Sequence, residues 1–339
     1  MKTLIIGAGV VGSFNAARLK EAGQDVTLLA RGRRLADLRE HGVVLEDFRT
    51  GLRTTTQVPL VDRLDPEDAY DLAIVVMRRN QIASVLPMLA QNRRIPTVLF
   101  LGNNACGSQD LVEALGRERV LMGLGNAGGA REGYVVRYVW KRWMALLFGE
   151  LDGRRTPRTK AIAQLYRSAG FSVRITKNVD AFLKTHAAGL PPLAGAAYLA
   201  GEKVRQLAHS PEALKLNVQA FREALRALRV LGIPIRPYAT RLVEWLPKAV
   251  VALLFRSLLD SRLADIGAQP HLDAAPDEWK ELADEMRVIL RKAGLPSPAS
   301  DILFARVDAR YQAAKSATTD TDLANTRACA QVASYSVHT

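Results

Sequence analysis

Two side chains that can donate a proton, Lys184 and His186, stand two positions apart in the segment DAFLKTHAAGLPPL, residues 180–193. A helix turns by about 100° per residue, so residues at this spacing point to nearly opposite sides of it. Only one of the two can therefore face a site on one side of the helix. The chemistry in question is general-acid catalysis, in which a positioned side chain gives a proton to a reacting oxygen.

The simplest structural roles of these two side chains differ. Lys184 follows Asp180 by four residues, which is the spacing of an exposed ion pair on one helix. His186 lies in the middle of the apolar face of the same helix, where a buried, hydrogen-bonded core histidine is the plain alternative to a catalytic one. The residues of that face are Val179, Phe182, Leu183, Ala187 and Leu190.

A glycine motif near the N-terminus indicates a cofactor site. Its residues, in the order GAGVVG, are Gly7, Ala8, Gly9, Val10, Val11 and Gly12. The motif directly follows an apolar strand and opens a helix, which is the context of a dinucleotide-binding turn. Gly7 allows the tight turn, Gly9 lets the backbone approach a pyrophosphate, and Gly12 permits close helix–strand packing. The N-terminus of the helix then stabilises the phosphate charge.

The end of the second predicted strand, LLARGRR, predicts which dinucleotide binds. An NAD site normally carries an acidic residue there, which holds the ribose 2′-hydroxyl. This chain has Arg31 instead, nineteen positions after Gly12, and no carboxylate until Asp37. Because an arginine can pair with a 2′-phosphate, we expect NADP(H). Arg33 and Arg34 either assist it or are surface charges.

Short apolar runs alternate with amphipathic helical stretches through the first half of the chain, which predicts a parallel sheet with crossover helices. The predicted strands are 3–7, 25–30, 72–77, 97–101, 119–123 and 172–176, and residues 135–140 and 143–148 are predicted to form a hairpin. From about residue 178 helical periodicity takes over. Ser210 and Pro211 begin a helix that ends at Gly232.

These elements predict an α/β fold with two domains. A Rossmann-type dinucleotide-binding domain is expected over residues 1–177, and an all-α domain that contributes the substrate site and catalytic residues over residues 178–339. The segment from Ala314 onward is rich in small and polar residues with little periodicity. It is expected to form a loosely held tail.

Composition limits the classes of partner and compartment. The 339 residues carry a formal charge of +13, which suits an anionic partner, but the basic pairs are dispersed and no nucleic-acid-binding pattern is present. The apolar run 248–259 is far short of the roughly 20 residues that a membrane span needs. The two cysteines, Cys106 and Cys329, provide no disulfide framework, and Cys106 lacks a visible partnering base. We expect a cytoplasmic protein with no nucleic-acid or membrane partner.

The motifs together resemble those of the ketopantoate reductase (2-dehydropantoate 2-reductase) family, over roughly residues 1–305 by the order of elements. Beyond GAGVVG and Arg31, the segment VVMRRNQ places Arg78 where the family has a lysine, and LFLGNN places Asn103 after a strand, as the family does. GNAGGAREG resembles the segment that closes over the nicotinamide, with Gly129 at the contacting backbone position. The resemblance implies NADPH-dependent reduction of a 2-oxo acid, a place in pantothenate biosynthesis, and cofactor contacts by Arg78, Asn103 and Gly129. Structurally, Arg78 could instead be a surface cation and Asn103 a turn residue.

The resemblance also bears on the two proton donors. In the family, a lysine on the first helix of the C-terminal domain acts as general acid, and this helix lines the interdomain cleft. Alignment without gaps places His186 at that position, and alignment of the aromatic-x-basic pattern places Lys184 there. Because the role requires an inward-facing residue and histidine can supply a proton near neutral pH, His186 is favoured over Lys184.

The last helix of the resemblance adds a third catalytic candidate and a departure. Glu278 matches a glutamate that approaches the cofactor or substrate; the alternative is an exposed carboxylate favoured in a helix's first turn. His271 lies nearby and could be a loop histidine. The asparagines that hold the family's substrate are missing, since their places hold Ala188 or Leu190, then Pro192 or Ala194.

These observations lead to one function and one alternative. The leading expectation is the reduction of a 2-oxo acid, ketopantoate or a bulkier relative, to the 2-hydroxy acid by hydride transfer from NADPH with general-acid protonation. The alternative is a redox sensor that binds NADP without turnover. The expected partner is the small-molecule 2-oxo acid, with a homodimer as the candidate assembly and no metal site.

Overall fold

The computed structural model describes residues 1–335, and its N-terminal half is built on an eight-stranded sheet in the order β12-β11-β8-β7-β6-β1-β2-β5. The bounds are β1 Thr3–Ile6, β2 Val26–Leu29, β5 Leu60–Val61, β6 Leu72–Val75, β7 Val98–Leu101, β8 Val120–Leu124, β11 Leu146–Glu150 and β12 Val173–Ile175. Neighbouring strands are parallel except β8 and β11. The central strands are buried throughout, which explains their continuous apolar runs. This confirms the predicted Rossmann-type sheet.

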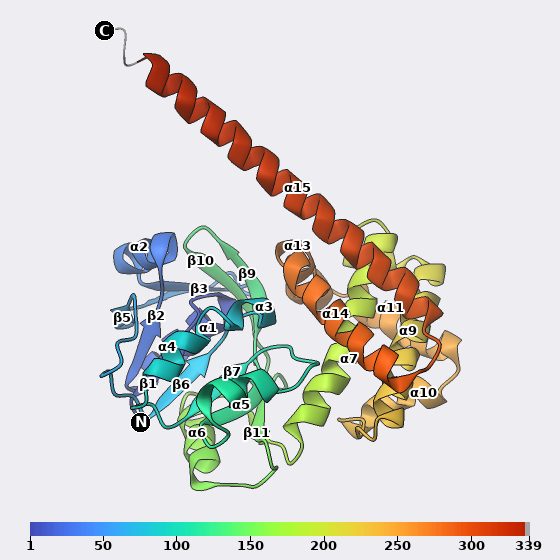
Figure 1. Ribbon diagram of the computed structural model, residues 1–339, viewed down its shortest axis with the longest axis horizontal. Coiled ribbons are helices and arrows are strands. Elements are labelled where there is room, and N and C mark those ends of the chain that lie inside the picture. Colours follow the sequence, from blue (N-terminus) through green and yellow to red (C-terminus); the bar gives the residue numbers. More distant parts are fainter. Residues whose placement is uncertain (336–339) are drawn as a thin grey trace.

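Helices cover both faces of this sheet (Figure 1). They are α1 Val10–Glu21, α2 Gly32–His41, α3 Arg79–Ile82, α4 Leu86–Gln91, α5 Gln109–Leu115 and α6 Pro157–Ser168. Alternate residues of a strand point to opposite faces. Ile5 accordingly packs in one cluster with Phe14 of α1 and Tyr166 of α6, whereas Leu4 packs in another with Leu89 of α4.

A second sheet, in the order β4-β3-β10-β9, corrects the predicted hairpin. Its strands are β3 Val43–Asp47, β4 Arg53–Thr56, β9 Gly128–Glu132 and β10 Val135–Val139. β10 pairs with β9 and β3, whereas β11 pairs with β8 in the large sheet, so residues 135–140 and 143–148 do not form a hairpin. The tight turn instead lies between β9 and β10, where Gly133 adopts a φ of +58° that glycine accommodates.

The C-terminal half is helical, as predicted. Its helices are α7 Val179–Leu199, α8 Val204–Ala208, α9 Pro211–Val230, the 3-10 turn Tyr238–Arg241, α10 Leu242–Trp245, α11 Lys248–Leu259, α12 Arg262–Gly267, α13 Gln269–Ala274, α14 Pro276–Ala293 and α15 Pro298–Tyr335. None of the helices in the described residues is long and apolar enough to cross a membrane. The division of the chain at residue 177 stays a prediction, and α7 begins just beyond it.

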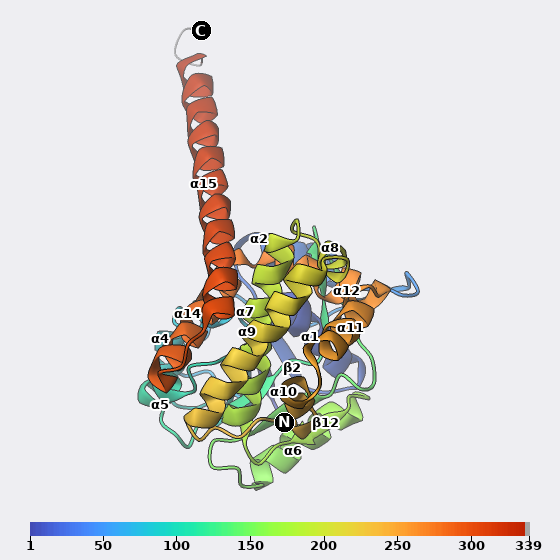
Figure 2. The same ribbon diagram turned by 90° about the vertical axis from the view of Figure 1, so that its right-hand side faces the viewer.

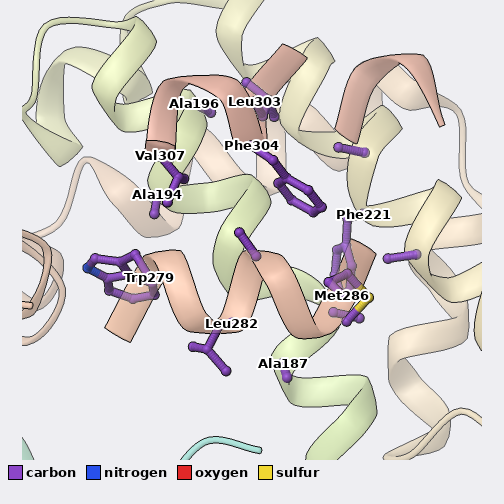
Figure 3. Close-up of a cluster of buried hydrophobic side chains, with 14 of the residues drawn as sticks. Ala187, Ala194, Ala196, Phe221, Trp279, Leu282, Met286, Leu303, Phe304 and Val307 are labelled. Atoms are coloured by element: carbon purple, nitrogen blue, oxygen red, sulfur yellow. The ribbon is translucent and has the colours of Figure 1, made fainter. Parts of the chain in front are cut away.

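The core of this half forms where α7, α9, α14 and α15 pack together (Figure 3). Small residues of α7, such as Ala187, Ala194 and Ala196, face larger ones of the other helices, among them Phe221, Met286 and Phe304. The approach is close enough that a Cβ on Gly195 would lie 2.3 Å from the carbonyl oxygen of Leu303. The alanine stripe of α7 is therefore the surface on which the other helices pack.

The segment expected to be a loosely held tail from Ala314 continues helix α15 to Tyr335. Figures 1 and 2 show this part of the helix extending away from the body of the protein. Residues 299–335 contain no glycine or proline, so nothing in their backbone ends the helix even though regular apolar spacing is absent.

Candidate active site

The glycine motif forms the turn between β1 and α1, as predicted. Gly7 has a φ of +110°, and a Cβ there would lie 2.2 Å from the carbonyl oxygen of Val76. A Cβ on Gly12 would lie 1.8 Å from the carbonyl oxygen of Gly7, whereas a Cβ on Gly9 would meet nothing within 4 Å. The first and last glycines are therefore required by the turn itself. The middle one leaves open space in front of the N-terminus of α1, whose first turn has no acidic residue.

Arg31 stands at the start of α2, beside the end of β2, and its side chain is exposed. Its Nε donates to the carbonyl oxygen of Asp62 at 3.3 Å, and Nη2 lies 3.4 Å from Sδ of Met88. Among the side chains that the structure describes, no carboxylate pairs with this guanidinium. Arg31 thus keeps its charge available to an anion that reaches this edge of the sheet.

Arg34 is buried, so the surface-charge alternative for it is wrong. Its guanidinium donates to the carbonyl oxygens of Ala8 and Tyr134 and to Oγ of Ser13, each at 3.1 Å. Burial, reinforced by repulsion from Arg131, lowers the pKa of Arg34 to about 10. Because every branch of its head group is engaged by protein, Arg34 braces the glycine turn against the β9–β10 turn.

Replacing Arg34 with lysine is expected to lower the free energy of unfolding by about 1–3 kcal/mol, because a single ammonium cannot serve three divergent buried acceptors. Urea unfolding followed by circular dichroism measures the change. Arg33→Lys is the matched control, since Arg33 is exposed on the same helix and should shift stability by less than about 0.5 kcal/mol. Equal stabilities of the two variants would contradict the bracing role.

Asn103 and Glu278, which are 175 residues apart in sequence, form a direct pair. Nδ2 of Asn103, in the loop after β7, donates to Oε1 of Glu278, in the first turn of α14, at 2.8 Å. Glu278 is 3% exposed, so the alternative of an exposed carboxylate is wrong. Its other oxygen, Oε2, is buried and accepts no well-aligned hydrogen bond from the described residues. Two side chains that can carry positive charge lie near Oε2: Nε2 of His271 at 3.3 Å and Nε of Arg78 at 3.9 Å.

Arg78 joins the two halves of the protein. Its Nη1 donates to Oδ1 of Asp277 at 2.9 Å and its Nη2 to the carbonyl oxygen of Ala274 at 2.7 Å. Asn80 donates to the other oxygen of Asp277 at 2.7 Å. Arg78 is therefore not simply a surface cation at a strand end; it lies beside the carboxylate of Glu278.

The loop between β7 and α5 docks into the helical half. The backbone N–H of Ala105 donates to Oε2 of Glu285 at 2.7 Å, and Arg79 pairs with the other oxygen of Glu285 at 3.2 Å. Desolvation raises the pKa of Cys106 in this loop to about 11, and the charge of Glu285 adds to the effect. The thiol is thus protonated at neutral pH, which agrees with a passive cysteine.

Lys184 makes the predicted ion pair with Asp180, with Nζ 2.6 Å from Oδ2, but it is only 16% exposed. A Cβ on Gly107 would lie 3.6 Å from Nζ of Lys184. Lys184 therefore faces the β7–α5 loop, which also carries Asn103. The expectation that Lys184 points outward to solvent is wrong.

His186 was expected to lie buried on the apolar face of its helix. Its side chain is exposed instead, so that expectation is wrong as well. The physical reason is that the neighbouring helices pack on the alanine stripe of α7 and leave Phe182, His186 and Leu190 partly uncovered. No hydrogen bond or ion pair to His186 occurs within the described part of the chain.

Gly129 lies in β9 with a φ of +143°, and a Cβ there would lie 2.1 Å from the carbonyl oxygen of Arg137. The neighbouring Gly128 faces α12, where its Cβ would lie 3.7 Å from Cα of Gly267. Glycine at 129 is thus explained by β9–β10 packing. A contact with the nicotinamide stays a prediction.

His271 belongs to helix α13 rather than to a loop, and no sequence pattern indicated its contact with Glu278. The two residues are seven positions apart, but Ala275 separates their helices, so periodicity does not relate their side chains. Asp277 was missed, and the burial of Arg34 was not anticipated, because charge alone does not distinguish a buried ion pair or hydrogen-bonded group from a solvated one.

Comparison with known proteins identifies relatives that match about half of the chain. The family model described as Ketopantoate reductase PanE/ApbA matches residues 3–153. An uncharacterized oxidoreductase of Bacillus subtilis, YkpB, is 27% identical over 53% of this chain and 59% of its own length. A 2-dehydropantoate 2-reductase of Pyrococcus horikoshii is 25% identical over 53% of this chain and 57% of its own. The matches thus span less than two thirds of these relatives.

Solved structures match nearly the whole chain and show its fold. The D-mandelate dehydrogenase in a ternary structure with NADH and anilino(oxo)acetate has a TM-score of 0.75 at 18% identity, covering 92% of this chain and 99% of the other. A 2-dehydropantoate 2-reductase of Geobacter metallireducens has a TM-score of 0.74 at 16% identity, covering 91% and 100%. The arrangement of a glycine-turn sheet followed by packed helices is therefore shared with these proteins.

Proposed function

We propose that this chain, which belongs to the ketopantoate reductase PanE/ApbA family, is an NADP-dependent oxidoreductase that reduces a 2-oxo acid to the 2-hydroxy acid. The observation that carries the proposal is the buried Asn103–Glu278 pair at the same edge of the sheet as the glycine turn. Ligands of open parallel sheets bind at the carboxyl ends of the strands, where both features lie.

The residues present fit NADP(H). The open space at Gly9 and the N-terminus of α1 suit a pyrophosphate, and the unpaired charge of Arg31 suits the 2′-phosphate. When bound, the reduced nicotinamide supplies the hydride that attacks the carbonyl carbon. Gly129 and Asn103 are proposed to contact the cofactor beside it.

At the substrate end, the protein offers one amide, one carboxyl group and one guanidinium. Asn103 would donate a hydrogen bond to the reacting carbonyl oxygen. Oε2 of Glu278, which is buried without a partner, would accept a hydrogen bond from the substrate. Arg78, already beside Glu278, can pair with the substrate's carboxylate or a cofactor phosphate.

Of the two residues on α7, we propose that Lys184 rather than His186 serves the carbonyl oxygen. Lys184 lies against the loop that carries Asn103, whereas the side chain of His186 is exposed and makes no hydrogen bond or ion pair with the described residues. An ammonium group next to the reacting oxygen stabilises the negative charge that develops there during reduction. This reverses the preference drawn from helical periodicity.

The substrate itself is proposed to be larger or more apolar than ketopantoate. The positions that hold asparagines in the family are here Ala188 or Leu190 and Pro192 or Ala194, depending on the alignment. Ala188, Pro192 and Ala194 are buried, and their side chains carry no polar group. They cannot make the hydrogen bonds that asparagines would make to the substrate. The role in pantothenate biosynthesis that the family name implies depends on ketopantoate being accepted.

Oxidation of NADPH, followed by absorbance with ketopantoate and a panel of bulkier 2-oxo acids, tests this function. We expect turnover of at least one of these acids. Lys184→Ala should lower kcat by about 10²-fold or more, and His186→Ala by less than about threefold. Loss of activity in the His186 variant alone would contradict our choice of residue. Tight NADPH binding without turnover of any acid would contradict the reductase and favour a sensor.

A further inference from the structure

Glu285, on helix α14, is a buried carboxylate to which neither the sequence pattern nor the proposed chemistry gives a role. It lies two turns after Glu278 and is 5% exposed. Its Oε2 accepts a hydrogen bond from the backbone N–H of Ala105 at 2.7 Å, and its Oε1 accepts one from Nε of Arg79 at 3.2 Å. A side chain of the helical half therefore holds two segments of the sheet half.

The cost of burying this charge argues against an incidental contact. Taking a carboxylate out of water is unfavourable unless hydrogen bonds and an opposite charge compensate it. Desolvation accordingly raises the pKa of Glu285, while the N–H of Ala105 and the charge of Arg79 act in the opposite direction. Apolar side chains of similar volume would hold the two halves together at lower cost, whereas a carboxylate fixes its partners in defined directions. What the ionised group adds is therefore orientation.

Arg79 connects the same carboxylate to the far end of the β7–α5 loop. Its side chain is 13% exposed, and its Nη2 lies 2.8 Å from Oδ2 of Asp110, in the first turn of α5. The loop is also tied internally. Nδ2 of Asn104 donates to the carbonyl oxygen of Gly107 at 2.8 Å, and the N–H of Gly107 donates to Oδ1 of Asn104 at 2.6 Å. These bonds make the loop a stiff unit that Glu285 holds directly and through Arg79.

This loop carries or adjoins the groups proposed to act on the substrate. Asn103, whose amide is proposed to donate to the reacting carbonyl oxygen, is one of its residues. Nζ of Lys184 lies against it, 3.6 Å from the position of a Cβ on Gly107. Glu278 and Glu285 hold the loop from two places about 10 Å apart along α14. A shift at the second place would therefore be transmitted to Asn103.

We infer that Glu285 is a positioning residue for the reduction: through the β7–α5 loop, it sets the distance and direction of the Asn103 amide toward the reacting carbonyl oxygen. The inference rests on the proposed function. Glu285 neither touches the substrate nor transfers a proton, and Lys184 remains the group that serves the oxygen. Because misplacing a reacting group by about 1 Å can cost about 10²-fold in rate, the effect of Glu285 should appear in kcat.

Replacing Glu285 with glutamine keeps the shape of the side chain but leaves one acceptor oxygen for two donors. We expect kcat to fall by about 10–100-fold, while the Kd for NADPH, which depends on the glycine turn and Arg31, changes by less than about threefold. Glu281→Gln, one turn earlier on α14 and partly buried, is the matched control and should keep kcat within about twofold of wild type. A kcat of Glu285→Gln within about twofold of wild type would overturn the inference.

A double-mutant cycle distinguishes the positioning of Asn103 from a general loosening of the protein. If Glu285 acts through Asn103, Glu285→Gln should lower kcat by less than about threefold in an Asn103→Ala background. The same fold-change in both backgrounds would overturn the inference. Arg79→Gln is a second variant, which keeps the test decisive if Glu285→Gln does not fold. Because it leaves the hydrogen bond from Ala105 in place, it should lower kcat by about 3–10-fold, with the same dependence on Asn103.

The contact itself can be measured without substrate at Cys106, which follows Ala105 and is exposed. Desolvation and the charge of Glu285 together raise the pKa of this thiol to about 11. In a Cys329→Ser background, Glu285→Gln should lower this pKa, so that alkylation of Cys106 at about pH 9 becomes faster. An unchanged pKa would overturn the contact and with it the inference.

The outcomes separate this inference from the proposed function. Wild-type turnover of a 2-oxo acid without coupling between Glu285 and Asn103 would overturn the positioning role and leave the reductase intact. A wild-type enzyme that turns over no 2-oxo acid would overturn both, whereas the pKa of Cys106 would still report the contact of Glu285 with the loop.

Discussion

Replacing Arg31 with alanine is expected to raise the Kd for NADPH by about 10–100-fold, which corresponds to roughly 1.4–3 kcal/mol for charge-assisted hydrogen bonds to a phosphate. Arg31 is exposed at the end of β2, and within the described chain it pairs with no carboxylate, so its charge is available for the 2′-phosphate. NADH lacks this phosphate, and its Kd should change by less than about threefold. Fluorescence titration of the reduced cofactors measures both values.

Arg33→Ala provides the matched control for this experiment. Arg33 is exposed and only two residues away, so it shares the general electrostatic field of Arg31 but not its position beside the strand end. Equal losses of NADPH affinity in both variants would indicate a diffuse field rather than a specific contact. An unchanged Kd for NADPH in Arg31→Ala would contradict the assignment of Arg31 to the 2′-phosphate.

Replacing Glu278 with glutamine is expected to lower kcat by about 10²–10³-fold, because it removes the charge of the buried carboxyl group that is proposed to hold the substrate beside the reacting oxygen. The amide has nearly the same shape, and its carbonyl oxygen can still accept the hydrogen bond from Asn103 that is 2.8 Å long in the wild type. The fold and the Kd for NADPH should therefore change little. Steady-state kinetics and cofactor titration together measure this separation.

The control for Glu278 is Glu281→Gln, three residues further along α14 and only partly buried. We expect it to keep kcat within about twofold of wild type, as substitutions away from the reacting atoms usually do. If Glu278→Gln retained wild-type kcat, or lost activity only in step with a loss of thermal stability, the carboxyl group would have no part in the chemistry.

Much of the N-terminal fold follows from local sequence patterns. The runs at residues 3–7, 25–30 and 97–101 are mostly apolar because their strands are covered on both faces, and the glycine motif marks the first turn by steric need alone. The hairpin was misplaced because Lys141 and Arg142 have the polarity of a turn, although the strands on either side of them belong to different sheets. Which strands pair depends on contacts that lie far apart in sequence.

The candidate site was harder to predict for the same reason. Asn103 and Glu278 were each identified from the family resemblance, but their direct contact joins residues 175 positions apart. His186 was assigned to a buried face because periodicity shows which residues share a side of a helix but not which side other helices cover. In α7 the other helices cover the alanine stripe. Lys184 is therefore mostly buried and His186 is exposed, which is the opposite of what periodicity suggested.

The most direct test of the account is transfer of deuterium from NADPH labelled at C4 of the nicotinamide to a 2-oxo acid, with the product analysed by mass spectrometry and NMR. We expect deuterium at C2 of the 2-hydroxy acid from one of the two C4 stereoisomers of the labelled cofactor, and none when Glu278→Gln is assayed for the same short time. Binding of NADPH without any deuterated 2-hydroxy acid, over ketopantoate and the bulkier acids, would contradict the proposed reductase.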